Sequence, residues 1–182
     1  MAEVFFKELC KFDTLFTAWL HVRSRARRSS SRAIREAAEE FEQKSHTKLR
    51  SIQSRLTRSG YSFPPAEGVL KDRIKRERQG KLPRPIVVAG IESRIVQRSL
   101  LQCLQPAPGS TLDNHLKVLR SINSSDVNFG GTPNGGVPKA LKQVLAALNS
   151  DHILYYKSDI AAFFTKVPHA YIVNFLTAET ND

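Results

Sequence analysis

The sequence contains few cysteines, the residues that form the disulfides and zinc sites of many small secreted or zinc-dependent domains. Only two of its 182 residues are cysteines, Cys10 and Cys103. They are too few and too far apart for a thiolate metal site, and they give no sign of a disulfide-forming compartment. We therefore expect a cytoplasmic protein whose core depends on hydrophobic burial, for which this length is sufficient.

Long apolar runs and internal repeats are also lacking. The N-terminal stretch MAEVFFKELCKFD interrupts its apolar residues with Glu3, Glu8 and Asp13. Such a stretch is neither a secretory signal nor a membrane span. A soluble globular protein with no membrane partner is expected.

Negative charge is scarce, and the shortage is uneven along the chain. The net charge is +11, from 28 basic and 17 acidic side chains. Residues 1–60 contribute +6 (13 basic, 7 acidic), residues 61–105 contribute +5 (9 and 4), and residues 106–182 contribute nothing (6 and 6). A basic half is typical of proteins that bind nucleic acid, although a basic face that is merely solvated has the same composition.

Apolar spacing predicts two N-terminal helices. The first covers residues 4–22, where apolar side chains recur every three or four positions. The stretch HVRSRARRSSS is then predicted to be a basic link, with Ser31 as the N-cap of a second helix that ends at Gly60. The inward stripes are Phe5, Leu9, Phe12, Phe16 and Trp19 in the first helix, and Ile34, Ala38, Phe41, Leu49, Ile52 and Leu56 in the second.

A β-hairpin is predicted after the helix-breaking pair Pro64-Pro65. Two extended stretches flank Gln79-Gly80, which favours a tight turn between them. Strands joined in this way bring the intervening basic residues to the tip of the hairpin. These residues are Lys75, Arg76, Arg78, Lys81 and Arg84.

The rest of the chain is predicted to alternate helices with one strand. ESRIVQRSLLQCL favours a helix with Ile95, Val96, Leu100 and Leu104 inward, and Pro138 suits the first turn of another helix. HILYYKSDI, residues 152–160, favours a strand, and a last helix begins near His169. The apolar side of the helix at Pro138 comprises Val137, Leu141, Val144, Leu145 and Leu148.

Asp159 follows directly on that apolar strand and has two possible roles. An aspartate there commonly caps the turn that follows. Alternatively, a rigid strand end gives a carboxylate the precision that a Mg²⁺ ligand needs. Phe163 and Phe164 lie in the same turn, either as packing or as a wall against a sugar.

Three segments in a fixed order resemble a known family. GKLPRPI, SRIVQRSLLQCL and KSDIAAFFTKVPHAYIVNFL resemble the fingers and early palm of bacterial reverse transcriptases, particularly those of group II introns and their relatives in antiviral defence. AWLHVRSRA and LTRSGYSFPPAEGV are similar to the N-terminal helices and lead-in of that family, so the resemblance covers about residues 15–176. It implies an α+β chain with three regions, namely an N-terminal basic helical region (1–60), a fingers-like region (61–150) and the start of a palm (151–182).

The resemblance also implies roles for single residues. Asp159 corresponds to the first metal-binding aspartate of the palm, with the backbone carbonyl of Ile160 beside it and Mg²⁺ as the cofactor. Phe164 corresponds to the aromatic steric gate that favours deoxynucleotides. Arg84 corresponds to the fingers arginine that grips the triphosphate of a dNTP, with Lys75 or Arg76 as its companion, and a guanidinium fork suits phosphate oxygens.

The template and primer are expected to meet other basic residues. The implied partners are an RNA template and a DNA or RNA primer, contacted by Arg78 and Lys81 of the hairpin and by Arg94 and Arg98 of the following helix. Arg94 and Arg98 share one helix face, so either of them has an alternative role in pairing with Glu92.

Three departures from the family pattern limit the expected activity. Pro83 is inserted before Arg84, and Ser93 stands where the family has an aspartate. The second catalytic motif, a tyrosine with paired aspartates, is missing, and no two aspartates are adjacent anywhere in the sequence. The chain is therefore expected to be inactive without a completing polypeptide that carries the rest of the palm and the thumb, and its unfinished sheet to favour association. The alternative is a noncatalytic nucleic-acid-binding protein derived from a reverse transcriptase, in which Asp159 is only a turn residue.

Overall fold

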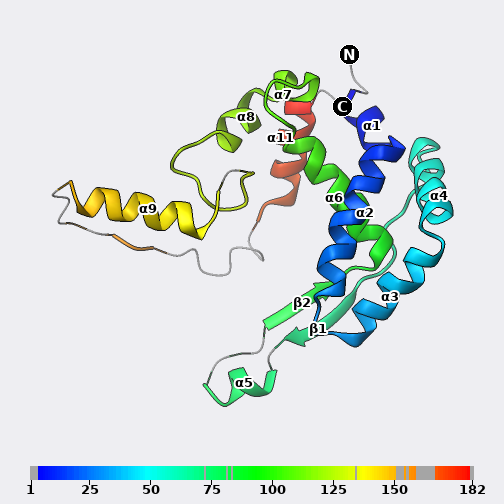
Figure 1. Ribbon diagram of the computed structural model, residues 1–182, viewed down its shortest axis with the longest axis horizontal. Helices are drawn as coiled ribbons and strands as arrows, with labels where there is room; N and C mark the ends of the chain where they lie inside the picture. Colours follow the sequence, from blue (N-terminus) through cyan, green and yellow to red (C-terminus); the bar gives the residue numbers. More distant parts are fainter. Residues whose placement is uncertain are drawn as a thin grey trace. The chain divides into compact units, whose positions relative to one another are not determined.

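The elements of the chain group into two compact units (Figure 1). The N-terminal unit comprises Lys7–Gln102, and the C-terminal unit comprises Met1–Phe6 together with Cys103–Asp182. The three regions expected from the sequence are not tested by this grouping and stay a prediction. The computed structural model describes residues 4–180 apart from Asp72, Lys81, Pro83, Asn134, residues 151–153, residue 155 and residues 159–166.

Helices dominate both units, and the described residues contain one two-stranded antiparallel sheet, so the α+β class is confirmed. The N-terminal helices are α1 (Val4–Leu9), α2 (Phe12–Arg27), α3 (Arg32–Gln43) and α4 (Ser45–Thr57). The sheet and its neighbours are β1 (Glu67–Lys71), α5 (Arg73–Glu77), β2 (Arg84–Val88) and α6 (Ile91–Leu104). The remaining helices are α7 (Thr111–His115), α8 (Lys117–Asn123), α9 (Val137–Leu148) and α11 (His169–Thr180).

The single helix predicted over residues 4–22 is wrong, because the chain breaks it between α1 and α2. Lys11 has an extended conformation, and the helical bonding pattern stops at Cys10. The Cys10 carbonyl accepts a hydrogen bond of 2.8 Å from the side-chain amide of Gln53. A partner from α4 thus satisfies a backbone acceptor near the break, as a partly buried polar group requires.

Helix α2 also runs through the predicted basic link as far as Arg27. Its buried side chains recur at helical spacing and form the centre of the N-terminal core. Phe16, predicted to face inward, is 41% exposed, whereas its neighbour Leu15 is fully buried. The buried residues of α2 are Leu15, Ala18, Trp19, Val22 and Ala26.

Helices α3 and α4 replace the second predicted helix, with the break at Lys44. Both helices contact α2, and the Phe41 ring lies 4.6 Å from the ring of Trp19 between centroids. Ser31 occupies the predicted N-cap position of α3 without making a side-chain capping bond. The predicted inward residues Ala38, Phe41, Leu49, Ile52 and Leu56 are confirmed as buried, and Ile34 packs against them.

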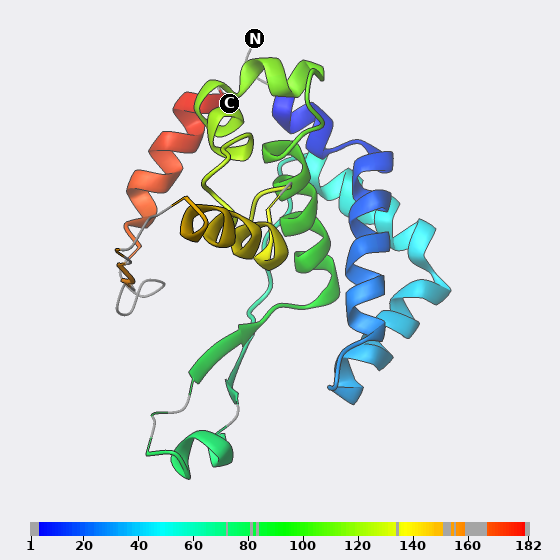
Figure 2. The same ribbon diagram turned by 60° about the vertical axis from the view of Figure 1, so that its left-hand side comes forward.

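The predicted hairpin is confirmed as β1 paired with β2, in a register that runs from Glu67 opposite Val88 to Lys71 opposite Arg84. The predicted tight turn is wrong, because residues 72–83 separate the strands and include α5. Arg, Lys, Ile and Glu are adequate to strong helix formers, which explains why this stretch winds into a helix. Gly80 has a φ of +64°, and its N–H donates to the Glu77 carbonyl just after α5. Figures 1 and 2 show α5 at the far end of the hairpin.

Helix α6 contributes Ile95 and Val96 to the N-terminal core, as predicted. The prediction that Leu100 also faces inward is wrong, because this side chain is 46% exposed. Ser99 takes the buried position instead, since it lies one helical turn after Ile95 and donates its hydroxyl to the Ile95 carbonyl at 2.9 Å.

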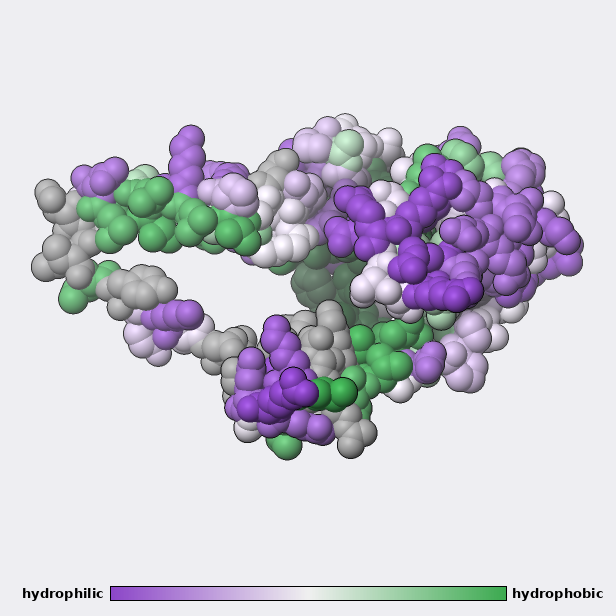
Figure 3. Space-filling model, turned by 60° about the horizontal axis from the view of Figure 1, so that its bottom comes forward, coloured by the Kyte–Doolittle hydropathy of each residue, from purple (hydrophilic) through white to green (hydrophobic). Residues whose placement is uncertain are grey.

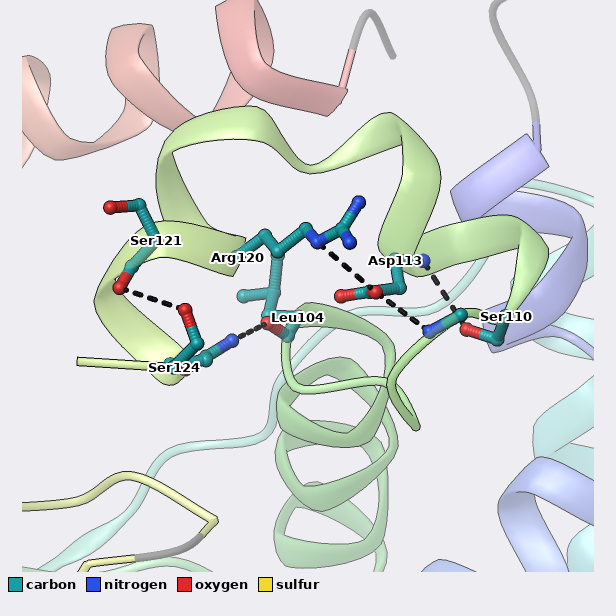
Figure 4. A network of polar contacts seen from close by, with 8 residues as sticks. Leu104, Ser110, Asp113, Arg120, Ser121 and Ser124 are labelled. Carbon is teal, nitrogen blue, oxygen red and sulfur yellow. Dashed lines mark hydrogen bonds and ion pairs between the residues drawn. The ribbon is translucent and has the colours of Figure 1, made fainter. Parts of the chain in front are cut away.

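In the C-terminal unit, a polar network fixes the start of α7 (Figure 4). The Ser110 hydroxyl accepts a hydrogen bond of 3.2 Å from the Asp113 N–H. The Asp113 carboxylate in turn accepts from the Gly109 N–H at 2.8 Å and lies 3.4 Å from Nε of Arg120 on α8. This bonding resembles a capping box, except that the carboxylate binds the N–H one residue before the N-cap, and the contact with Arg120 also ties α7 to α8.

Helix α9 is confirmed, with Pro138 in its first turn. Its apolar side chains are exposed rather than packed, and Figure 3 shows the hydrophobic surface along this helix. Helix α11 is confirmed from His169, and the Glu179 carboxylate accepts from the backbone N–H groups of Val118 and Leu119 at the start of α8.

The predicted strand over residues 152–160 is not found where the structure describes it. Leu154 and residues 156–158 have no strand pairing, and Leu154 and Tyr156 are both highly exposed. A strand needs a neighbour for its backbone bonds, and the sheet of the described residues contains only β1 and β2. None of the described helices combines the length and apolar character of a membrane span.

Candidate nucleic-acid interface

Phe163, predicted from the sequence to serve as packing or as a wall against a sugar, lies outside the described residues, as do four residues with predicted roles at the site. They are Asp159, Ile160 and Phe164 of the expected palm and Lys81 of the hairpin. Their predicted roles therefore stay predictions. Within the described part of the chain, no three His, Cys, Asp or Glu side chains group closely enough to hold a metal ion.

The other hairpin residues lie near one another at its tip. Lys75 and Arg76 belong to α5, Arg78 follows in the turn, and Arg84 is the first residue of β2. Arg76 is half-buried and donates from Nε to the Leu82 carbonyl at 2.6 Å. Lys75 and Arg78 are exposed, so both side chains are accessible to a ligand.

A second basic group lies on α2, where the sequence predicted a link. His21, Ser24, Arg25 and Arg28 are spaced by three, one and three residues, which places them on one side of a helix. They line a surface depression of about 450 Å³. Arg98 of α6 acts electrostatically on His21. We call these five residues the arginine face.

The neighbouring side of α2 is neutralised, which makes the arginine face distinct. Arg23 and Arg27 both bind the Glu42 carboxylate of α3, each at 2.7 Å. In contrast, Arg25, Arg28 and Arg98 have no ion pair with a carboxylate among the described residues. Figure 3 shows hydrophilic side chains gathered over α2, α3 and α4.

Hydrogen bonds within the arginine face hold two of its guanidinium groups in place. Arg28 donates from Nε to the Ser24 carbonyl at 3.1 Å and from Nη2 to the Ser24 hydroxyl at 2.7 Å. Arg25 donates from Nε to Nε2 of His21 at 3.3 Å. Because side-chain ordering costs entropy on binding, groups ordered in advance bind an anion more tightly.

The electrostatics of the face favour an anion. Burial and the nearby charges of Arg98, Arg25 and Arg28 lower the pKa of His21 below its ordinary value of 6.5. A lowered pKa agrees with the geometry, since Nε2 of His21 accepts a bond and is therefore unprotonated. Nε of Arg98 is buried and lacks a hydrogen-bond partner within the described residues. A buried donor without a partner costs free energy.

Sequence reasoning found one of the three arginines and missed two. Arg98 was predicted to meet nucleic acid, and the alternative of pairing with Glu92 is not observed, because the Glu92 carboxylate binds Arg55 at 2.5 Å. Arg94 is half-buried on the same helix, and Glu92 is not its partner either. Arg25 and Arg28 were missed because their segment was taken as a link. The signal was Ala26, which continues the apolar spacing of Trp19 and Val22.

Comparison of the chain with models of known protein families, with curated proteins and with solved structures gave no match.

Proposed function

We propose that this chain binds the sugar-phosphate backbone of a nucleic acid through the arginine face. One observation carries the proposal, namely that Arg25 and Arg28 line a depression together with His21, and no carboxylate of the described residues pairs with either arginine. Guanidinium groups recognise phosphate through paired hydrogen bonds, and contacts to the backbone supply most of the affinity in nonspecific nucleic-acid binding.

We propose further that this binding serves an RNA template and its primer in the fingers of a reverse transcriptase. The support is the motif resemblance together with the basic charge of residues 1–105. In this proposal Asp159 and the Ile160 carbonyl hold Mg²⁺, which would supply charge stabilisation for nucleotidyl transfer, and both are the hard oxygen donors that Mg²⁺ prefers. Phe164 selects deoxyribose, and Arg84 with Lys75 or Arg76 binds the dNTP triphosphate.

The second candidate is a noncatalytic nucleic-acid-binding protein. It is favoured by the location of the arginine face, which belongs to α2, its C-cap Arg28 and α6, and includes no residue of the expected palm. Both candidates require the same binding step and differ only in whether a completing polypeptide adds catalysis.

The binding step is tested with a fluorescein-labelled single-stranded RNA and the full chain, by fluorescence anisotropy over a series of salt concentrations. Arg25→Ala/Arg28→Ala should weaken binding at least about tenfold and make the log–log salt slope shallower by about 1.4, because about 0.7 is lost per phosphate contact with a single strand. Arg58→Ala is the matched control, because Arg58 is exposed and follows α4. The bond from Gln53 to Cys10 places that half of α4 at the opposite end of α2. An equal loss per arginine removed in the double variant and in the control would contradict a specific arginine face.

The polymerase step is tested by primer extension on an RNA template with Mg²⁺, using this chain together with its completing polypeptide. Asp159→Asn should abolish extension while leaving RNA affinity unchanged. Full activity in that variant would remove Asp159 from the metal site. If no combination of polypeptides extends the primer, the result would support the noncatalytic candidate.

A further inference from the structure

The arginine face carries more positive charge than is needed to neutralise one internal phosphate of a nucleic-acid strand. A phosphodiester carries a single negative charge and two free oxygens, whereas a terminal phosphate carries about 1.5 to 2 negative charges at neutral pH and three free oxygens. We propose that the arginine face is a binding site for the terminal phosphate of a nucleic-acid strand. This inference rests on the proposed function and specifies which phosphate the face prefers.

The first argument is that His21, Arg25 and Arg28 line one depression. His21 and Arg28 are seven residues apart, which is about 10 Å along a helix, and their side chains line the same depression. Arg25, Arg28 and Arg98 all act on the single imidazole of His21. A track for the interior of a strand would instead space its cations so that each met a different phosphate.

The second argument is the number of hydrogen-bond donors that stay available. A guanidinium group has five N–H donors. Arg25 uses one of its donors on His21 and Arg28 uses two on Ser24, which leaves four and three for a ligand. Three terminal oxygens with several lone pairs match this set better than two.

The third argument is the tautomer of His21. Because Nε2 accepts from Arg25, the proton of the neutral ring lies on Nδ1, where it is available to donate to a further acceptor. The ring therefore adds a donor without adding charge to the empty site. The depression of about 450 Å³ lies within the range of pockets that hold small ligands, so the phosphate can enter together with part of its terminal nucleotide.

The test compares RNA oligonucleotides of one sequence in competition anisotropy at fixed salt, with the full chain. Their ends carry a 5′-phosphate, a 3′-phosphate or hydroxyls only, and a hydroxyl-ended oligonucleotide longer by two nucleotides matches the added charge. We expect one phosphorylated oligonucleotide to bind at least about tenfold more tightly than the charge-matched one. Arg28→Ala should bring that ratio close to one, Arg28→Lys should retain part of it because charge remains without the fork, and Arg58→Ala should leave it unchanged.

The outcomes separate this inference from the proposed function. Equal affinity for all the oligonucleotides, still lowered by Arg25→Ala/Arg28→Ala, would refute the terminal-phosphate site and leave backbone binding intact. Binding of none of them would refute both. Competition by a free nucleoside monophosphate as strong as that by the phosphorylated RNA would refute a preference for a strand end. Unchanged Trp19 fluorescence in each variant verifies that the N-terminal core is folded.

Discussion

The register of α2 decides which residues form the arginine face, and it is open to a direct test. Leu15 is fully buried in the N-terminal core, whereas Phe16 is 41% exposed, although apolar spacing predicted Phe16 inward. We compare Leu15→Ala with Phe16→Ala. If the register is as the structure has it, the smaller side chain contributes more to the free energy of unfolding than the larger one.

The expected magnitudes follow from burial. Truncating a fully buried leucine to alanine costs about 2 to 5 kcal/mol, because transfer energy is lost and a cavity is left. Full burial of a phenylalanine contributes about 1.5 to 3 kcal/mol, so Phe16, with 41% of its surface exposed, should lose about 1 kcal/mol. Its stacked contact with Phe12, at 6.1 Å between centroids, adds about 0.5 kcal/mol.

Urea unfolding followed by tryptophan fluorescence measures both variants. The chain has one tryptophan, Trp19, and it lies in the N-terminal core, so the signal reports on that unit alone. With a slope of about 1 to 2 kcal/mol per molar urea, Leu15→Ala should lower the midpoint by roughly 1 to 5 M and Phe16→Ala, which costs about 1.5 kcal/mol in all, by roughly 0.8 to 1.5 M. A larger shift for Phe16→Ala than for Leu15→Ala would refute this register, and with it the arginine face.

Two further perturbations test the charge pattern and the C-terminal unit. Glu42→Gln releases Arg23 and Arg27 from their shared carboxylate, so RNA affinity and the salt slope should both increase, and an unchanged slope in anisotropy would show that these two arginines do not meet RNA. Although burial alone would raise the pKa of Glu42, hydrogen bonds from Arg27 and Arg23 lower it below the ordinary 4.5. The native state then binds fewer protons than the unfolded one, so this stabilisation is present above pH 4.5 and is lost as the pH falls through the lowered pKa. The urea midpoint should therefore decline over that pH range, and Glu42→Gln should make the decline smaller. Ser110→Ala removes the cap of α7 and should speed hydrogen exchange at the Asp113 amide by about 2- to 30-fold, whereas an unchanged rate would mean that the cap does not hold α7.

The sequence predicted those helices and strands whose apolar spacing or proline positions lie within a single stretch of the chain. The inward face of α3 and α4, the pairing of β1 with β2, and Pro138 at the start of α9 all follow from apolar spacing or from proline stereochemistry. The helix breaks at Cys10 and Lys44 could not be predicted in this way, because neither glycine nor proline lies at either position. The first involves a side chain 43 residues away, that of Gln53, which no local pattern contains.

The candidate site was only partly predictable for a similar reason. Abundant arginine between Val22 and Ser31 suggested a solvated link, yet arginine and alanine favour helix, and Ala26 continues the buried stripe. Which arginines stay unpaired depends on Glu42 of α3, and that contact exists only after the helices pack. The expected strand at residues 152–160 lies partly outside the described residues, and the described ones, 154 and 156–158, pair with no strand of the described chain.

The most direct measurement of the central claim is the NMR titration of the His21 imidazole, assigned with His21→Gln, in the free chain and with RNA bearing a terminal phosphate. In the free chain its pKa should lie below 6.5, because the ring is partly buried and the charges of Arg98, Arg25 and Arg28 surround it. Bound phosphate offsets those charges, so the pKa should rise on saturation with RNA, and it should not rise in Arg25→Ala/Arg28→Ala. An unchanged pKa of His21 in a chain that is fully bound to RNA would contradict phosphate binding at the arginine face.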